Sequence, residues 1–340
     1  MDLYVLNAAL APIAVVDNYE SLIWTTRYYT YGDFELYLPA DKLAFEILLQ
    51  GYYLKRSDSD RIMMIKNIGL DTDVESGDHL TVKGFSAERI LHQRIVWAQT
   101  NINGNAESGL RKIITDNLIS PSIASRKISN FILGEAVGYT ETIKKQTTGD
   151  FVDVVTTEIC TANKWGWKVT LNNNKQFVFN LYSGKVAAVT FSPEFDNLIS
   201  SKYQSDMSNY ANVALVAGEG EGTARKTAVV GAASGLNRYE MYVDARDVST
   251  NEGEISESEY KKVLSRRGLE KLNEALPVEA FDSEVDPNVT YKYKKDYDIG
   301  DVVTVVNEYG IKAESRIIEI IECFDNTGYS VVPTFEKWSV

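Results

Sequence analysis

The strongest constraint on the fold is an order of elements that occurs twice in the sequence. In each copy a helix pattern is followed by three alternating segments, in the second copy after one further short strand. The middle segment is rich in isoleucine and begins with an arginine. The first copy lies at 40–85, where Arg61 opens the middle segment, and the second lies at 256–335, where Arg316 does so. The copies share element order without sequence identity, and this predicts an internal duplication.

The segment 28–51 shows what the first copy contains. Its apolar residues occupy every second position, the period of a half-buried strand; they are Phe34, Leu36 and Leu38. Pro39 ends the strand pattern because it has no N–H to donate, and Asp41 can cap the short helix that follows. Gly51 ends this helix, whose apolar positions are Leu43, Ile47 and Leu48.

The residues between the two copies have a different pattern. The segment 105–120 carries a helical stripe, and after a loop Asp150 can cap a second helix. A hairpin follows, in which alternating residues of two strands face one another; the facing sets are Trp167, Val169 and Leu171, and Phe177, Phe179 and Leu181. We therefore predict a β-rich, multidomain α+β chain, with a β domain at 1–90, an α+β insert at 91–190 and a second β domain at 191–340.

The second β domain contains the best helix pattern in the chain, at 256–276. Ser256 and Glu259 form a capping box, in which each side chain accepts a hydrogen bond from the backbone of the other residue. An apolar stripe runs along this helix until Pro277; it consists of Tyr260, Val263, Leu264, Leu272 and Leu276.

Composition is typical of a globular protein that folds in a reducing compartment. The length of 340 residues favours two to four domains, and the two cysteines lie too far apart in sequence to form a disulfide scaffold. No run of about 18 apolar residues occurs, so no transmembrane helix is predicted. The N-terminus opens with Asp2 and lacks a basic region, which favours a first β-hairpin over a secretory signal.

The net charge of −13 argues against a protein that grips nucleic acid, because such proteins cluster lysine and arginine. It is compatible with a protein that DNA moves past without binding to it, because a negatively charged wall repels phosphates. Solubility alone also accounts for a charge of this size, and both explanations stay open.

Motifs for catalysis and ligand binding are missing. His79 and His92 are the only histidines, and the sequence has no HExxH, CxxC or GxxxxGK[ST] motif. The Gly-rich stretch 217–225 contains two glutamates that would repel a phosphate, so we predict a hairpin tip there. The acidic stretch 71–78 lacks the glycine and the final carboxylate of a calcium loop, which leaves at most a weak cation site. We expect no catalytic, cofactor-binding or metal-binding residues, and hence no enzyme.

A duplicated β domain has an architectural use. A ring of three chains places six similar domains around one axis, so that threefold symmetry imitates sixfold symmetry. The internal duplication would suit such a ring.

Several segments resemble the tail-hub, or tail-associated, proteins of long-tailed bacteriophages and prophages, whose fold is similar to the hub of contractile-tail baseplates. The resemblance extends over nearly the whole chain, from about Leu3 to Phe335, and is strongest at 32–36 and 300–303. The segments that carry it are 21–40, 210–222, 238–247, 255–272 and 297–322.

The resemblance implies a homotrimeric ring that closes the tail tube, with a baseplate-hub-like fold and two tube-type β domains per chain that adapt pseudo-sixfold to threefold symmetry for DNA passage. It places the protein in the virion tail after assembly in the host cytoplasm. The implied partners are a distal tail protein, tail tube proteins and tail fibre or receptor-binding proteins, with no stable membrane association. The residues expected at the lumen or at subunit contacts are Asp33, Glu35, Tyr37, Asp301 and Thr304.

Two other functions stay open. The first is a carbohydrate-binding or cell-wall-degrading tail protein, in which Trp165 and Trp167 would stack on sugars, although the alternation around Trp167 predicts a core residue. The sequence shows no C-terminal lytic or receptor-binding extension after 333–340, so we expect such modules on another protein. The second is an ordinary cytosolic β-rich enzyme.

Overall fold

The computed structural model describes residues 2–72, 77–198, 200–248, 256–284, 290–310 and 312–336. Contacts divide the chain into two compact units: the first comprises Met1–Ser201 and Asp282–Glu336, and the second is built from Lys202–Phe281. The acidic stretch at 71–78 lies partly outside the described residues. The three-part division drawn from the sequence pattern stays a prediction.

The N-terminal part of the first unit is an antiparallel sheet. Its strands are neighbours in the order β3-β4-β7-β6-β5-β1-β2. Their bounds are β1 Leu3–Leu6, β2 Pro12–Val16, β3 Ser21–Arg27, β4 Asp33–Pro39, β5 Tyr53–Arg56, β6 Ile62–Asp71 and β7 His79–Ser86. The alternation in β4 is confirmed, because Phe34, Leu36 and Leu38 are buried. The first hairpin predicted at the N-terminus is also present, as β1 and β2.

The short helix α1 (Lys42–Ile47) follows β4. Asp41 caps it as predicted, since its carboxylate accepts a hydrogen bond from the Ala44 N–H at 2.6 Å. The predicted apolar stripe is wrong at Leu43, which is 59% exposed, while Ala44 faces the core instead. A helix of six residues makes fewer than two turns, so residue spacing defines its buried face poorly.

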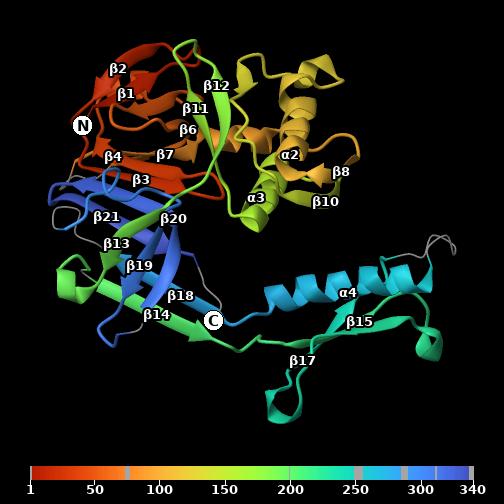
Figure 1. The fold of residues 1–340 in the computed structure, drawn as a ribbon. Helices are drawn as coiled ribbons and strands as arrows, with labels where there is room; N and C mark the ends of the chain where they lie inside the picture. Colours follow the sequence, from red (N-terminus) through yellow and green to blue (C-terminus); the bar gives the residue numbers. More distant parts are fainter. Residues whose placement is uncertain are drawn as a thin grey trace. The chain divides into compact units, whose positions relative to one another are not determined.

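The C-terminal strands extend the same sheet. Strands β19 (Val302–Val306), β20 (Lys312–Asp325) and β21 (Gly328–Phe335) form an antiparallel meander, and so do β5, β6 and β7, as the repeated element order predicts. Strand β20 also pairs with β3, where Arg27 and Glu319, 292 residues apart in the chain, lie opposite one another. Figure 1 shows this pairing as β20 in blue beside β3 in red.

Three further strands adjoin the C-terminal meander. Strand β13 (Val186–Phe191) pairs with β19 in parallel. Strands β18 (Val278–Glu284) and β14 (Ser200–Asp206) follow β21 in the strand order. The N-terminal and C-terminal strands thus form one sheet rather than two separate ones.

The residues expected to form an α+β insert supply helices and two small sheets. The elements are β8 Thr100–Asn105, α2 Ala106–Ile114, β9 Phe131–Leu133, β10 Thr142–Thr147, α3 Val152–Asn163, β11 Gly166–Leu171 and β12 Phe177–Tyr182. The predicted hairpin register is confirmed, since Trp167 lies opposite Leu181 and Val169 opposite Phe179. Asp150 does not cap α3, because its carboxylate accepts a hydrogen bond from the Thr147 hydroxyl at 2.7 Å instead.

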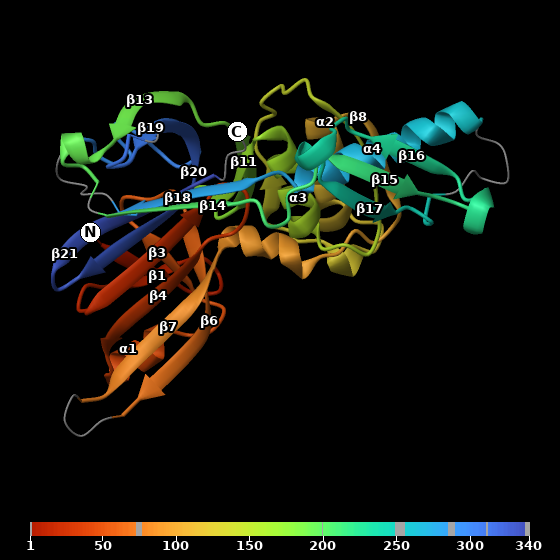
Figure 2. The same ribbon diagram turned by 90° about the horizontal axis from the view of Figure 1, so that it is seen from below.

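Two apolar cores lie in the N-terminal sheet and the insert of the first unit. One lies between α1 and the N-terminal strands, around Trp24 and Leu36. The other joins α2, α3 and the β11–β12 hairpin to the opposite side of β6, where Ile62 and Met64 contribute. Figure 2 shows α1 beside the long β6–β7 hairpin in a second view. The insert therefore packs directly on the N-terminal sheet.

The second unit is a three-stranded sheet covered by one helix. Its strands have the order β16-β15-β17, with bounds β15 Val213–Ala217, β16 Thr227–Val230 and β17 Glu240–Asp244. Helix α4 (Glu257–Glu274) buries Tyr260, Leu264 and Leu272, as its apolar stripe predicts. Leu276 lies beyond the helix end and is 40% exposed, so its place in the stripe is wrong. The capping box of Ser256 and Glu259 is confirmed.

The cap of α4 gives a first testable expectation. Ser256→Ala should lower the free energy of unfolding of the second unit by about 0.5–2 kcal/mol, because the Glu259 N–H, 3.3 Å from the Ser256 hydroxyl, loses its acceptor. Urea unfolding followed by circular dichroism measures the change. Ser265→Ala inside the same helix is the control and should not destabilise α4. Equal unfolding of both variants and the parent would show that the cap contributes nothing.

Candidate functional site

One sheet face joins the N-terminal and C-terminal strands of the first unit. The strand registers place Cys323 of β20 opposite Ile23, Ile23 opposite Glu35, and Glu35 opposite Lys83. Directly opposed residues of neighbouring strands point to the same side. Trp24, the neighbour of Ile23, points to the other side and is buried. The first side is therefore a continuous surface across β20, β3, β4 and β7, which we call the shared sheet face.

Charged residues on the shared sheet face pair with one another. The Lys83 Nζ lies 2.7 Å from the Glu35 carboxylate. Arg27 of β3 forms ion pairs with Asp33 of β4 and Glu319 of β20, and so connects the two ends of the chain. Burial alone would lower the pKa of the Arg27 guanidinium, but the two carboxylates outweigh it and raise this pKa. The pairing fixes β20 on β3 by side chains as well as by backbone.

The first three residues expected at a lumen or subunit contact come together on the shared sheet face. Asp33, Glu35 and Tyr37 alternate with buried residues of β4, and all three are partly exposed. The ring of Tyr37 stacks on His79, with 4.8 Å between the ring centroids. Their assignment to a lumen or a subunit contact stays a prediction.

The other two expected residues lie at β19, away from β4. Asp301 is 3% exposed, and its carboxylate accepts hydrogen bonds from the N–H groups of Lys185 at 2.8 Å and Asp298 at 3.0 Å. These bonds hold the turn before β19. Thr304 is partly exposed in β19, between β13 and β20. The structure thus gives Asp301 an internal role, and the expected lumen role of both residues stays a prediction.

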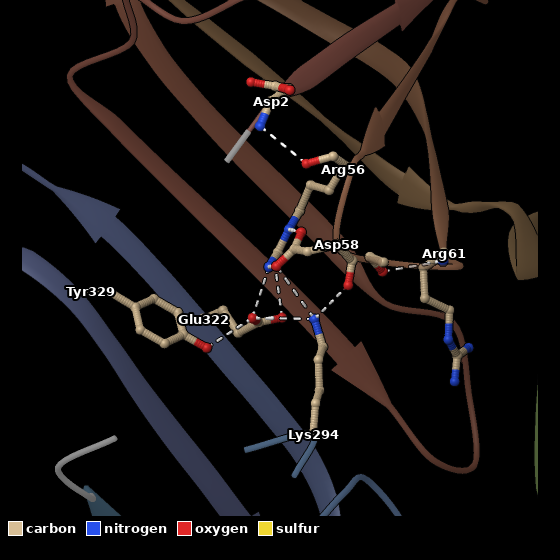
Figure 3. A network of polar contacts seen from close by, with 9 residues as sticks. Asp2, Arg56, Asp58, Arg61, Lys294, Glu322 and Tyr329 are labelled. Atoms are coloured by element: carbon tan, nitrogen blue, oxygen red, sulfur yellow. Dashed lines mark hydrogen bonds and ion pairs between the residues drawn. The ribbon is translucent and has the colours of Figure 1, made fainter. Parts of the chain in front are cut away.

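A buried ion pair joins β5 to β20. Arg56 and Glu322 are 0% and 2% exposed, and two guanidinium nitrogens donate to the two carboxylate oxygens at 2.9 and 2.8 Å (Figure 3). The guanidinium also lies over the rings of Trp24 and Phe324, 5.4 and 4.7 Å from their centroids. This bidentate and stacked arrangement requires the planar group of arginine.

Three further side chains complete this network. Asp58 accepts hydrogen bonds from Arg56 at 2.9 and 2.6 Å, and the Tyr329 hydroxyl donates to Glu322 at 2.9 Å. The Lys294 Nζ lies 3.6 Å from Glu322 and 3.7 Å from Asp58 (Figure 3). Burial alone would raise the pKa of Asp58, but the hydrogen bonds and charge of Arg56 lower it below its ordinary value. We call these five residues the central ion cluster.

A polar cavity of about 510 Å³ lies beside the central ion cluster. Residues from the β5–β6 turn, β11, β12 and 293–301 line it. Several of its charged residues form ion pairs, as Lys168 does with Asp60. The hydrogen bond and charge of Lys168 lower the pKa of Asp60, although burial opposes them. Paired charges of this kind connect the N-terminal sheet, the insert and the C-terminal segment.

The two arginines predicted to open the middle strands have different positions and surroundings. Arg61 directly precedes β6, as predicted, but Arg316 lies inside β20, which already begins at Lys312, so that part of the prediction is wrong. Arg61 is 6% exposed, forms an ion pair with buried Glu88 and donates to the Tyr182 hydroxyl at 3.0 Å. Arg316 donates to the Gly300 carbonyl at 2.5 Å and lies over the ring of Tyr28. The repeat therefore extends to the order of strands and not to the contacts of these arginines.

The tryptophans considered for sugar stacking are buried. Trp165 and Trp167 are 2% and 0% exposed, so neither ring is presented at the surface. Trp167 is a core residue as predicted, and its indole N–H donates to the Tyr29 carbonyl at 2.5 Å. Trp97, which no sequence pattern singled out, is 55% exposed and lies against Arg126, whose guanidinium is 4.8 Å from the ring centroid.

The histidines contact carboxylates. His92 Nδ1 lies 2.9 Å from both carboxylate oxygens of Asp153, and His79 Nε2 lies 3.1 Å from Glu20. Among the residues that the structure describes, no three His, Cys, Asp or Glu side chains are grouped so that they could hold a metal ion. In the same residues, no helix combines the length and the apolar character needed to cross a membrane.

Solved tail proteins share this fold. The 43 kDa tail protein of prophage MuSo2 from Shewanella oneidensis is 13% identical, with a TM-score of 0.62, and the match covers 99% of this chain and 98% of that chain. The tail protein from Neisseria meningitidis MC58 is 12% identical, with a TM-score of 0.61 and coverage of 99% and 96%. A chain of the PdpA–VgrG complex is 9% identical, with a TM-score of 0.51 and coverage of 99% and 64%.

These likenesses confirm the resemblance to tail proteins that the sequence predicts, and they concern the fold. No curated protein sequence matches the chain. The family model described as Siphovirus ReqiPepy6 Gp37-like protein matches residues 2–335, nearly the whole chain. The chain therefore belongs to the Siphovirus ReqiPepy6 Gp37-like family.

Proposed function

We propose that the chain is a structural hub subunit at the tip of a phage or prophage tail, where three copies form a ring that closes the tail tube and lets DNA pass. The observation that carries this proposal is the pairing of β3 with β20, which makes one sheet face out of the two ends of the chain. Three such faces around an axis supply the wall of a channel.

The two ends of the chain act as two similar tube-type domains. Each contains an antiparallel meander of three strands, β5-β6-β7 in one and β19-β20-β21 in the other. Three copies then place six similar walls around one axis, and threefold symmetry can match a sixfold tube. The distal tail protein, the tube proteins and the fibre or receptor-binding proteins are the neighbours of such a ring.

Ring closure needs an available sheet edge. Strand β5 pairs with β6 only between Ile62 and Met64. From Asn67 to Asp71, β6 pairs with β7 on one side, and the described strands leave its other side open. An open edge of this kind is a template for another strand. We place the contact between this edge of one copy and the C-terminal strands of the next copy, a heterologous contact that closes after three copies.

The charge of the shared sheet face suits a channel for DNA. Acidic residues from both ends of the chain lie on it, and its basic residues Arg27 and Lys83 are each paired with a carboxylate. Paired bases have little charge left to bind a phosphate backbone, whereas clusters of unpaired lysine and arginine would hold DNA. DNA is therefore a passing cargo in this proposal.

The oligomeric state tests the proposal. Native mass spectrometry of the purified chain is expected to give three times 38.1 kDa, and electron microscopy is expected to show a three-lobed ring with a central hole. A monomer at all concentrations that is also absent from purified tails would contradict it, as would a ring lined mainly by lysine and arginine. Assays with peptidoglycan and polysaccharides address the alternative function, since release of muropeptides or reducing ends by the purified chain would favour a cell-wall-degrading protein.

A further inference from the structure

The sheet of the second unit has one covered and one open face. Helix α4 covers the first face, where Ala214 and Val216 of β15 belong to the apolar core. On the other face, Leu215 lies opposite Val229 of β16 and Tyr242 of β17. These three side chains are 44%, 62% and 57% exposed. They form an apolar row across all three strands, which we call the open apolar row.

The open apolar row lines a hollow. The hollow has a volume of about 440 Å³, and Val213, Met241, Arg238 and Glu240 complete its lining. Soluble proteins seldom expose several large apolar side chains side by side unless another molecule covers them. This sheet buries only one of its two apolar faces. Packing another element on the second face would be favourable, because it would remove apolar surface from water.

The charges around the open apolar row show what kind of partner fits. Arg238 pairs with Glu240 and Arg246 with Asp244. Arg225 donates to the Tyr242 hydroxyl at 2.8 Å and to the Gly220 carbonyl at 3.1 Å; within the described part of the chain it forms no ion pair with a carboxylate. Of the three arginines in these contacts, Arg238 and Arg246 are each paired with a carboxylate, whereas Arg225 has no such partner among the described residues.

We propose that the open apolar row docks an amphipathic, acidic helix of another protein. Three strands about 4.8 Å apart give a face about as wide as one helix, whose diameter is about 10–12 Å, and α4 already occupies the opposite face in this way. The apolar side of the partner helix covers Val229, Leu215 and Tyr242. A carboxylate of the helix supplies Arg225 with the ion pair that the described residues of the chain do not provide.

A second copy of the chain fits this face less well. Symmetrical packing of two open apolar rows would bring the arginines of one copy against those of the other, which is unfavourable. It would also create a twofold axis, whereas the proposed ring is threefold. The partner is therefore a different protein. Because this partner would be another protein of the tail, the inference rests on the proposed function.

Site-specific photo-crosslinking in assembled tails tests the inference. In the full chain, the photoreactive amino acid p-benzoylphenylalanine replaces Val229. The Val229 side chain is exposed, which leaves room for a larger one. We expect an adduct with another tail protein, and mass spectrometry should place the cross-link in a helical segment with Asp or Glu on one side. Leu269, 53% exposed on α4, is the matched control and should give no such adduct.

Charge reversal separates specific docking from chance contact. In the same chain, Arg225→Glu should lower the adduct yield several-fold, whereas Lys261→Glu on α4 should leave it unchanged. An adduct with a second copy, an adduct to a basic segment, or no adduct in tails that contain the chain would each overturn the inference alone. Absence of the chain from purified tails would contradict the proposed function, and the inference with it.

Discussion

Arg56→Met should lower the free energy of unfolding of the first unit by about 3–5 kcal/mol, the usual cost of removing one partner from a buried ion pair. Glu322, 2% exposed, would lose both guanidinium hydrogen bonds and stay buried. Lys294, 3.6 Å away, and the Tyr329 hydroxyl would remain as weaker partners. Urea unfolding of the purified chain, followed by tryptophan fluorescence, measures this change.

A surface pair of the same sheet provides the control. Lys83→Met breaks the ion pair with Glu35, whose two side chains are 51% and 41% exposed, and exposed pairs contribute only about 0–1 kcal/mol. The double variant Arg56→Met with Glu322→Met should be more stable than Arg56→Met alone, because no unpaired charge stays buried. Equal effects of Arg56→Met and Lys83→Met would show that the central ion cluster does not hold β5 and β20 together.

Local pattern was sufficient to predict most strands and helices. The facing sets of the β11–β12 hairpin were predicted to the residue, because alternation over six residues on each side of a short turn leaves one favourable register. The cap at Ser256 was found because its signal lies within four residues. Leu43 and Leu276 were misplaced, since each lies at the edge of a helix, where periodicity gives little information.

The contacts that define the site could not be predicted in this way. The pairing of β3 with β20 joins residues 292 positions apart. No local feature of either strand indicates which strand it will pair with. The same holds for Arg56 and Glu322, which appear in the sequence as single charges in alternating strands and meet only after that pairing has formed. The face with Asp33, Glu35 and Tyr37 was predicted, but its extension onto β20 was not.

Close packing inside this sheet leads to the second large effect. Gly84 of β7 lies between β4 and β6, next to the bulge of β6. A Cβ atom there would lie 1.9 Å from the Met64 carbonyl oxygen and 2.8 Å from the ring of Phe34. A backbone oxygen cannot rotate away, so Gly84→Ala must move β6 away from β7. We expect a loss of about 3 kcal/mol in the free energy of unfolding, the upper end for overpacked cores.

Gly69→Ala on the neighbouring strand β6 is the matched control for Gly84→Ala. Its Cβ would meet only the Thr81 carbonyl oxygen at 3.9 Å, so the change should be neutral or stabilise by up to about 1 kcal/mol, because alanine restricts the unfolded chain. Urea unfolding of both variants decides between the outcomes. If Gly84→Ala unfolds like Gly69→Ala, β6 and β7 can separate at little cost. A displaced β6 should also weaken the trimer, because the proposed subunit contact uses the outer edge of that strand from Asn67 to Asp71.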